Sequence, residues 1–211
     1  MPHWLVLVLL AAASYFAGTF SPAVLISKKE AGFDIRTKGS GNAGTTNMLR
    51  VIGWKAGVLT FIADVAKGAL TTLLGLHLSR VLGMENNLGA YIAGAAVLLG
   101  HAYPVFNKFR GGKCVATAGG VWLAMMPVPT LIAAAAAVGI MALTRRVSVG
   151  SIAGALGYPA VMFFLPSPPI PDPVMPWFSL AAGLFIAFLH RANIVRLLRG
   201  EEKPLTIARK K

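Results

Sequence analysis

The chain has 211 residues, of which 56% are hydrophobic and 13% charged, and its mean hydropathy is +0.68. Soluble globular domains carry about 25% charged residues, so this composition excludes an ordinary soluble enzyme and indicates a polytopic membrane protein. The formal net charge of +13 could suggest a nucleic-acid partner. The cations, however, lie in short segments between apolar runs, where they report membrane orientation, and we expect no nucleic acid as a partner. The single cysteine, Cys114, excludes an internal disulfide.

Apolar runs long enough to cross a bilayer follow one another along the chain. The first, residues 5–26, has no basic region before it, which predicts an uncleaved first helix rather than a signal peptide. We interpret residues 83–87 and the proline-rich residues 166–173 as external links. Four further runs predict spans at residues 57–78, 89–105, 148–165 and 175–189.

The apolar run at residues 115–143 is too long for one upright span and rather short for two. Pro127 and Pro129 can break it into a hairpin of two short helices. This division brings every Lys and Arg except Lys67 and Arg80 to one side of the membrane, as the positive-inside rule requires. The sequence therefore predicts an all-α integral membrane bundle of seven transmembrane helices, with the amino terminus outside and the carboxyl terminus in the cytoplasm.

Three polar segments fall on the predicted inner face. They are residues 39–50 (GSGNAGTTNMLR), 101–117 (HAYPVFNKFRGGKCVAT) and 190–202 (HRANIVRLLRGEE). All three combine glycine or small polar residues with cations, and all three meet the membrane at helix ends. We assign them to a single transmembrane domain, residues 1–211.

The glycines of the first two segments stand just before expected helices. Gly41 and Gly44 precede a short helix, and Gly111 and Gly112 precede the helix that begins near residue 115. Glycine lets the backbone turn so that several N–H groups point to one place, which suits phosphate oxygens, and a helix amino terminus adds partial positive charge. Each turn is therefore a candidate anion cradle.

Carboxylates are absent from both glycine loops. None lies between Asp34 and Asp64, and none between Glu85 and Asp172. Neither loop can therefore supply a carboxylate to hold Mg²⁺ or to act as a general base, which disfavours metal-dependent phosphatidyl or nucleotidyl transfer. We expect no metal and no cofactor, and a site that binds two phosphates through cations and N–H donors.

The three segments together resemble the cytoplasmic motifs of the bacterial membrane-bound acyl-phosphate:glycerol-3-phosphate acyltransferases. The resemblance extends to the chain length, the seven-span layout and the DVAKG of the second span. Thr45 stands where alanine is usual in that family, and Arg110 where lysine is commoner. The resemblance implies transfer of a fatty acyl group from acyl phosphate to the 1-hydroxyl of sn-glycerol 3-phosphate, giving lysophosphatidic acid and phosphate, at the cytoplasmic face of the bacterial inner membrane. It implies no need for acyl-CoA or acyl carrier protein.

The resemblance also assigns roles to residues. Ser40, Arg50, Lys113 and Asn193 would contact substrate, and His190 is the candidate catalytic residue. An acyl phosphate is already activated, so positioning and electrostatics can supply much of the catalysis. The hydroxyl proton can pass to a substrate phosphate oxygen, which we prefer, or to His190. The residues expected to cradle phosphate are Gly41, Asn42, Gly44, Thr46, Asn47, Gly111 and Gly112.

Structural roles compete with these functional ones. The polar side chains of residues 39–50 can cap a helix and satisfy a turn. We interpret Asp64 and Lys67, spaced i, i+3 within the second span, as a mutual pair that supports the site, and Glu202 as a brace for the third segment. We expect His101 to be a structural hydrogen-bonding residue.

Two other functions remain open from the residues alone. A carrier for an organic phosphate or anion would place its site near the bilayer midplane, whereas the polar segments lie on one face. A non-catalytic membrane scaffold leaves the three segments unexplained. Acyl-chain preference and oligomeric state cannot be predicted from the sequence.

Overall fold

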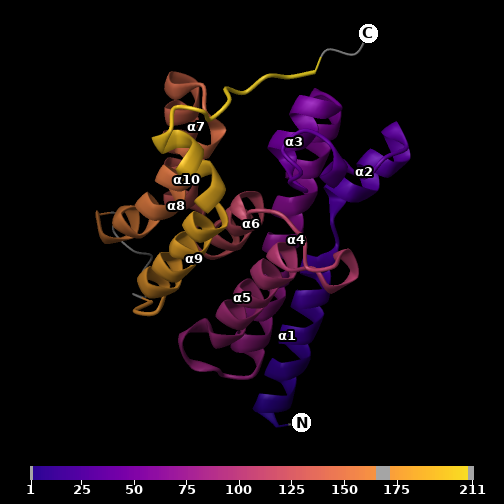
Figure 1. Ribbon diagram of the computed structural model, residues 1–211. Coiled ribbons are helices and arrows are strands. Elements are labelled where there is room, and N and C mark those ends of the chain that lie inside the picture. The colour runs from indigo at the N-terminus through magenta and orange to yellow at the C-terminus, as the bar shows by residue number, and fades with distance from the viewer. Residues whose placement is uncertain (1, 165–171, 209–211) are drawn as a thin grey trace.

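The computed structural model describes residues 2–164 and 172–208, and within these residues the chain forms helices and no strand. The predicted external link at residues 166–173 lies mostly outside the described residues. The helices run upward and downward between two ends of the molecule (Figure 1). The α-helices are α1 (His3–Thr19), α2 (Pro22–Ala31), α3 (Thr45–Val51), α4 (Trp54–Val81), α5 (Leu88–Ala102), α6 (Val115–Met125), α7 (Pro127–Thr144), α8 (Val147–Phe164), α9 (Met175–Leu189) and α10 (Arg191–Leu198), with 3₁₀ turns η1 (Ile35–Thr37), η2 (Glu85–Asn87) and η3 (Val105–Asn107).

Four helical stretches are long and apolar enough to cross a membrane, or five if a bent pair counts as one span. The four are His3–Ala31, Trp54–Val81, Glu85–Asn107 and Pro127–Thr144, and the pair is α9 with α10, bent by 63°. Large hydrophobic side chains are exposed along these helices, among them Phe61, Ile62 and Leu70 of α4. In water such a surface would be unfavourable, but against lipid tails it is expected.

Prolines break the chain at two places. The predicted break at Pro127 is confirmed, because α6 ends at Met125 and α7 begins at Pro127. The predicted first span lies within His3–Ala31, which is long and apolar enough to cross a membrane, but it is divided: α1 ends at Thr19 and α2 begins at Pro22. Proline has no N–H to continue the helical ladder, and the Ser21 hydroxyl instead accepts the amide of Val24 at the start of α2.

Small residues let the helix backbones approach closely. Gly18 of α1 lies against Gly100 of α5, and a Cβ added to either would lie 3.0 Å from the other's Cα. Gly120 of α6 likewise faces the backbone of α4 at Val65 and Ala69. Because lipid tails provide no hydrophobic drive for helix association, such close backbone packing is a main source of its stability.

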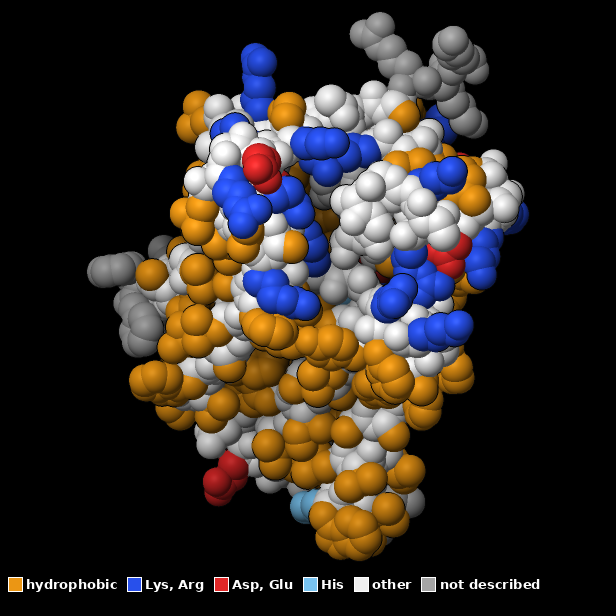
Figure 2. Space-filling view, viewed as in Figure 1, with side chains coloured by type: hydrophobic (Ala, Val, Ile, Leu, Met, Phe, Trp, Pro, Cys, Tyr) orange, Lys and Arg blue, Asp and Glu red, His pale blue; other side chains and the backbone are white. Residues whose placement is uncertain are grey.

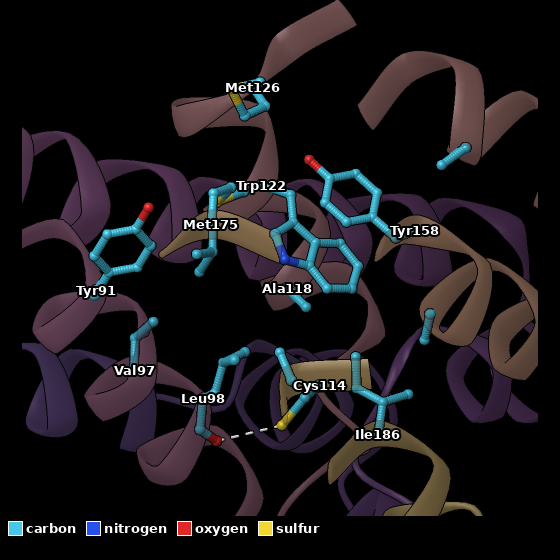
Figure 3. Packing of buried hydrophobic residues seen from close by; sticks show 14 of the residues in the cluster. Tyr91, Val97, Leu98, Cys114, Ala118, Trp122, Met126, Tyr158, Met175 and Ile186 are labelled. Carbon is cyan, nitrogen blue, oxygen red and sulfur yellow. Dashed lines mark hydrogen bonds between the residues drawn. The ribbon is translucent and has the colours of Figure 1, made fainter. Parts of the chain in front are cut away.

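One buried cluster joins α5, α6, α8 and α9 (Figure 3). The rings of Trp122 and Tyr158 stack in it with centroids 4.3 Å apart and planes inclined by 12°. The Tyr158 hydroxyl lies 3.0 Å from the Thr130 hydroxyl of α7, so its polar end is satisfied. Cys114, just before α6, points toward Leu98 in the same view.

Lys and Arg side chains gather at one end of the molecule, while hydrophobic side chains cover most of the remainder of the visible face (Figure 2). The cationic end is hollowed between two groups of helices. The chain enters α1 at the opposite end and leaves α10 at the cationic end (Figure 1). The fold therefore concentrates positive charge around one opening.

Candidate active site

A cavity of about 280 Å³ lies at the cationic end, where the three polar segments meet. Its walls come from α3 and the loop before it, the loop before α6, and the junction of α9 with α10. Asp64 of α4 and His101 of α5 also line it. The predicted site residues that line the cavity are Ser40, Asn42, Gly44, Thr46, Asn47, Arg50, Asp64, Lys113, His190, Asn193 and Glu202.

The first segment is folded around the side chain of Asn47, which is only 1% exposed. Its Oδ1 accepts the amide of Ser40 at 2.9 Å, and its Nδ2 donates to the carbonyls of Ile35, Lys38 and Asn42 at 3.2, 3.1 and 3.0 Å. These bonds occupy the polar atoms of the side chain. The side chain of Asn47 therefore holds the loop together, whereas its position in the sequence predicted that it would cradle phosphate.

Other groups of the first segment keep donors for a ligand. Thr45 Oγ1 and Arg50 Nε are buried, line the cavity and have no hydrogen-bond partner among the described residues. Buried polar groups without partners are unfavourable, so both are ready to bind an anion. The other end of the Arg50 guanidinium donates from one terminal nitrogen to the carbonyls of Lys203 and Pro204, at 3.1 and 3.3 Å.

The glycines of the second segment, predicted to cradle phosphate, direct their amides to the end of α5. The amides of Gly111 and Gly112 donate to the carbonyls of Ala102 and His101 at 3.2 and 3.0 Å, and neither glycine lines the cavity. A Cβ on Gly111 would collide with the His101 carbonyl, and one on Gly112 with the His101 ring. Gly111 and Gly112 therefore fit the loop tightly against the end of α5.

Gly41 also lies outside the cavity lining. Its φ is +73°, and its amide donates to the Lys38 carbonyl at 3.1 Å. Gly41 thus forms a turn, which requires glycine because a residue with a Cβ rarely adopts this backbone conformation.

Lys113 carries the second segment's charge into the cavity. Its ammonium donates to Asn193 Oδ1 of the third segment. Burial, together with the nearby Arg196 and Arg50 charges, lowers the pKa of Lys113 to about 8, although Glu202 opposes the shift. An ammonium surrounded in this way by other cations gains most from a bound anion.

Glu202 holds the third segment together. Its Oε1 accepts Ser148 Oγ at 2.8 Å and Asn193 Nδ2 at 2.7 Å, and its Oε2 accepts Arg196 Nε at 2.7 Å. Burial alone would raise the pKa of Glu202, but the bonds from Asn193, Ser148 and Arg196 outweigh it and lower that pKa. The charged carboxylate fixes Asn193, which in turn receives Lys113.

His190 lies at the junction of α9 and α10 and is 3% exposed. Its Nδ1 is 2.8 Å from the Ile186 carbonyl, which can only accept, so Nδ1 donates. Burial lowers the pKa of His190 to about 4, with the Lys113 charge acting in the same direction and the Ile186 bond opposing it. A neutral imidazole that donates from Nδ1 leaves Nε2 as an acceptor.

The base of the cavity contains the predicted pair of α4. Lys67 Nζ lies 2.8 Å from Asp64 Oδ1, which confirms their pairing, and it also donates to the Gly18 and Phe20 carbonyls at the end of α1. Asp64 lines the cavity, whereas Lys67 does not. His101 Nδ1 lies 3.5 Å from Asp64 Oδ1 and 3.2 Å from the Thr117 hydroxyl.

Sequence reasoning missed several lining residues. His101 was expected only as a structural residue, and Arg196 and Ser148 were not singled out for the site, yet all three border the cavity. Arg196 follows Asn193 by one helical turn, a spacing that places both side chains on one face of a helix. Within the described part of the chain no group of three or more His, Cys, Asp or Glu side chains could hold a metal ion.

Comparisons with known proteins identify the family of the chain. Residues 8–200 match the family model for glycerol-3-phosphate acyltransferase. The chain is 39% identical over 206 residues to the glycerol-3-phosphate acyltransferase of Clostridioides difficile and 43% identical over 199 residues to that of Thermoanaerobacter sp.; each alignment covers 94% of this chain and 95% of the relative. It is also similar to the crystal structure of PlsY, an integral membrane glycerol 3-phosphate acyltransferase, in its glycerol 3-phosphate form, with a TM-score of 0.85, 34% identity and coverage of 95% and 96% of the two chains. The chain therefore belongs to the glycerol-3-phosphate acyltransferase family.

Proposed function

We infer that the protein transfers a fatty acyl group from acyl phosphate to the 1-hydroxyl of sn-glycerol 3-phosphate, giving lysophosphatidic acid and inorganic phosphate. This is the first acylation of phospholipid synthesis. The observation that carries the inference is the convergence of Arg50, Lys113 and Asn193, from three segments far apart in sequence, on one cavity. PlsY, which resembles this chain, has solved structures in its glycerol 3-phosphate and lysophosphatidic acid forms.

The cavity supplies what this reaction needs. Two phosphates must approach each other, and Arg50 and Lys113 offset their charge. The acceptor hydroxyl attacks the acyl carbonyl, a C–O ester bond forms, the bond between carbonyl carbon and phosphate oxygen breaks, and phosphate leaves. The hydroxyl proton passes to a phosphate oxygen of the substrate, with Nε2 of His190 as the alternative acceptor. Ser40 and Asn193 orient the substrates.

An apolar pocket of about 90 Å³ adjoins the polar cavity and shares Val115, Met141 and Ser151 with it. Small residues of α6, α7 and α8 line this pocket, and the side chains of Trp122 and Tyr158 also form part of its wall. Part of the donor's acyl chain occupies this pocket, which places the phosphate of the donor beside Lys113. A hydrocarbon chain is favourably buried against such an apolar lining.

Gly119 offers a test of the acyl-chain pocket. It lines the pocket, and a Cβ there would meet no atom within 4 Å, so the side chain of Gly119→Leu would begin in open space at the pocket wall. We expect this variant to lose roughly 10-fold in kcat/KM for palmitoyl phosphate while keeping its activity with octanoyl phosphate, a loss in line with filling a hydrophobic site. Gly157→Leu, on α8 and also in open space, is the matched control. Equal effects on both donors would place the chain elsewhere.

The proposal extends to seven spans, with the amino terminus outside and the cavity on the cytoplasmic face of a bacterial inner membrane. Adding the shorter apolar helices α6 and α8 and the bent α9 to the four long stretches gives seven. Lys113, just before α6, donates to Asn193, which donates to Glu202, and Ser148, at the start of α8, donates to Glu202 directly. The chain before α6 and the chain after α7 therefore lie at the same end of the molecule, which supports the α6–α7 hairpin. At the other end, Asn87 donates to Asp172 at 3.2 Å, which supports a shared outer side.

A single assay separates acyl transfer from transport. Purified protein is incubated with acyl phosphate and glycerol 3-phosphate and scored for lysophosphatidic acid, with acyl-CoA as the control donor. We expect product only with acyl phosphate. Absence of product, together with uptake of glycerol 3-phosphate into sealed vesicles, would favour the carrier instead. For topology, a reporter active only in the cytoplasm should work after Arg146 and be silent after Pro169.

A further inference from the structure

The described chain continues for several residues beyond α10. Residues 202–208, which we call the C-terminal strap, leave α10 and pass toward the α3 side of the cavity (Figure 1). Most of the strap carries no regular secondary structure, yet its backbone is tied at both ends. The strap lies beyond residues 8–200, the part of the chain that the family model matches.

Hydrogen bonds fix the strap on both sides of the opening. On one side Leu205 N donates to the Arg145 carbonyl at 2.9 Å, and Arg146 Nε donates to the Glu202 carbonyl at 3.1 Å. On the other side Ala208 N donates to the Leu49 carbonyl at 3.0 Å. Leu205 also lines the cavity. The strap thus spans from the α7–α8 turn to α3 and forms part of the cavity wall.

The strap holds Arg50 without neutralising it. One terminal nitrogen of the guanidinium is held by the Lys203 and Pro204 carbonyls, which are uncharged acceptors, while the buried Nε has no partner within the part of the chain that the structure describes. Arg36 and Arg196, in contrast, are paired with the carboxylates of Asp34 and Glu202. Arg50 is therefore oriented by the strap, and its positive charge stays available for an anion.

The position of Arg50 indicates which substrate it serves. The acyl-chain pocket is lined by residues of α6, α7, α8 and α9 and by none of α3 within the described chain. A donor whose chain lies in that pocket brings its phosphate to the Lys113 side. Arg50, on α3, is left for the phosphate of the acceptor.

We propose that residues 203–208 are a positioning element of the acceptor site: their backbone holds Arg50 in place for the phosphate of glycerol 3-phosphate and closes that side of the cavity. This inference rests on the proposed function. It predicts that loss of the strap weakens acceptor binding specifically, because an arginine free to rotate must be ordered again at each binding event.

The test compares two truncations of the full chain. Removing residues 203–211 deletes both carbonyls that hold Arg50 and every strap residue after Glu202, whereas removing only residues 209–211 deletes three cations and leaves the strap. We expect the longer truncation to raise KM for glycerol 3-phosphate about 10-fold while changing kcat and KM for acyl phosphate less than about 2-fold, since about 1.4 kcal/mol corresponds to tenfold in affinity. The shorter truncation should behave as the full chain. An unchanged KM for the acceptor, or equal changes for both substrates, would overturn the proposal.

Point variants keep the test decisive if the truncated chain fails to fold. Leu205→Pro and Ala208→Pro each remove one amide that anchors the strap, and Ile207→Pro removes an amide with no partner among the described residues. The first two should raise KM for the acceptor and the third should not. Calorimetric binding of glycerol 3-phosphate adds a coupling test: strap variants should weaken binding in the parent chain but have no further effect when combined with Arg50→Ala. Additive losses would contradict action through Arg50. A full-length chain that makes no lysophosphatidic acid would instead refute the proposed function.

Discussion

The loops before α3 and before α6 use their glycines differently. In the loop before α3, glycines turn the backbone around Asn47, and Arg50 and Thr45 face the cavity. In the loop before α6, the glycines fit the backbone closely against the end of α5, and Lys113 faces the cavity. Gly41 has a φ of +73°, and an added Cβ would meet only the Arg36 carbonyl, at 3.4 Å. Gly111 has no positive φ, but an added Cβ would meet the His101 carbonyl. Gly41 and Gly111 are therefore glycines for different physical reasons, the first for backbone conformation and the second for space.

Each loop nevertheless places one cation at the cavity, and each of these cations is held by hydrogen bonds to neutral acceptors. Lys113 is received by Asn193, and Arg50 by the Lys203 and Pro204 carbonyls. In each case the immediate acceptor is neutral, so the charge is oriented and not cancelled. The comparison separates the side chains that bind substrate from the glycines that place them.

The largest effects should come from removing either cation. We expect Arg50→Ala and Lys113→Ala each to lower kcat/KM by roughly 100- to 1,000-fold, the range found when a single charge-stabilising donor is lost. Lys113→Arg should also fail, since a planar fork replaces a compact ammonium. Arg110→Ala, an exposed cation of the same loop, is the control. Near-normal turnover in both alanine variants, measured as lysophosphatidic acid formed, would remove Arg50 and Lys113 from the site.

Substituting the glycines tests the contrast between conformation and space. Asparagine tolerates a left-handed backbone, so Gly41→Asn should fold nearly as well as the parent chain. Gly111→Asn should be destabilised by about 1–3 kcal/mol, the usual range for overpacking, because its side chain would collide with the end of α5. Thermal unfolding in detergent measures both. If Gly41→Asn is the less stable of the two, the assignment of the two roles is reversed.

Much of this site could be predicted from residues that act locally. The break at Pro127 follows from the missing N–H of proline, and the pairing of Asp64 with Lys67 follows from one turn of helix. The polar segments were expected on one face because loop charges distinguish the two sides. The structure brings their side chains to one cavity.

The remainder depends on partners far away in the sequence. The sequence does not show which groups the amides of Gly111 and Gly112 bind. In the fold these amides donate to the Ala102 and His101 carbonyls, respectively. Arg50 is held by carbonyls more than 150 residues further along the chain. Glycine content indicates that a backbone must turn or approach something closely, and only the fold shows which of the two is required.

The pH dependence of donor use should report the charge of Lys113, because the phosphate of the donor lies on the Lys113 side of the cavity. The pKa of Lys113 is lowered to about 8 by burial and by the neighbouring Arg196 and Arg50 charges. Below about pH 8 the ammonium is present and can bind phosphate, and above it the neutral amine cannot. We expect kcat/KM for acyl phosphate, which reflects the free enzyme, to fall as pH rises through about 8 and to lose up to roughly 10-fold per pH unit beyond it. A flat profile up to pH 9.5 would show that Lys113 stays charged or does not bind.

The smallest effect is expected at Cys114, which stands beside Lys113 but has no part in the chemistry. A neighbouring cation can activate a thiol, yet Cys114 is 1% exposed and its Sγ donates to the Leu98 carbonyl at 3.3 Å (Figure 3). A buried thiol that donates a hydrogen bond within an apolar cluster is a poor nucleophile. Acyl phosphate is already activated, so the reaction needs no covalent intermediate on the protein. Cys114→Ala should therefore retain at least about half the activity and lose about 1 kcal/mol of stability or less, the value of one weak hydrogen bond. Mass spectrometry of the parent chain after a brief reaction with acyl phosphate provides the stronger check, since a thioester on Cys114 would mean that the acyl group travels through the protein before it reaches the acceptor.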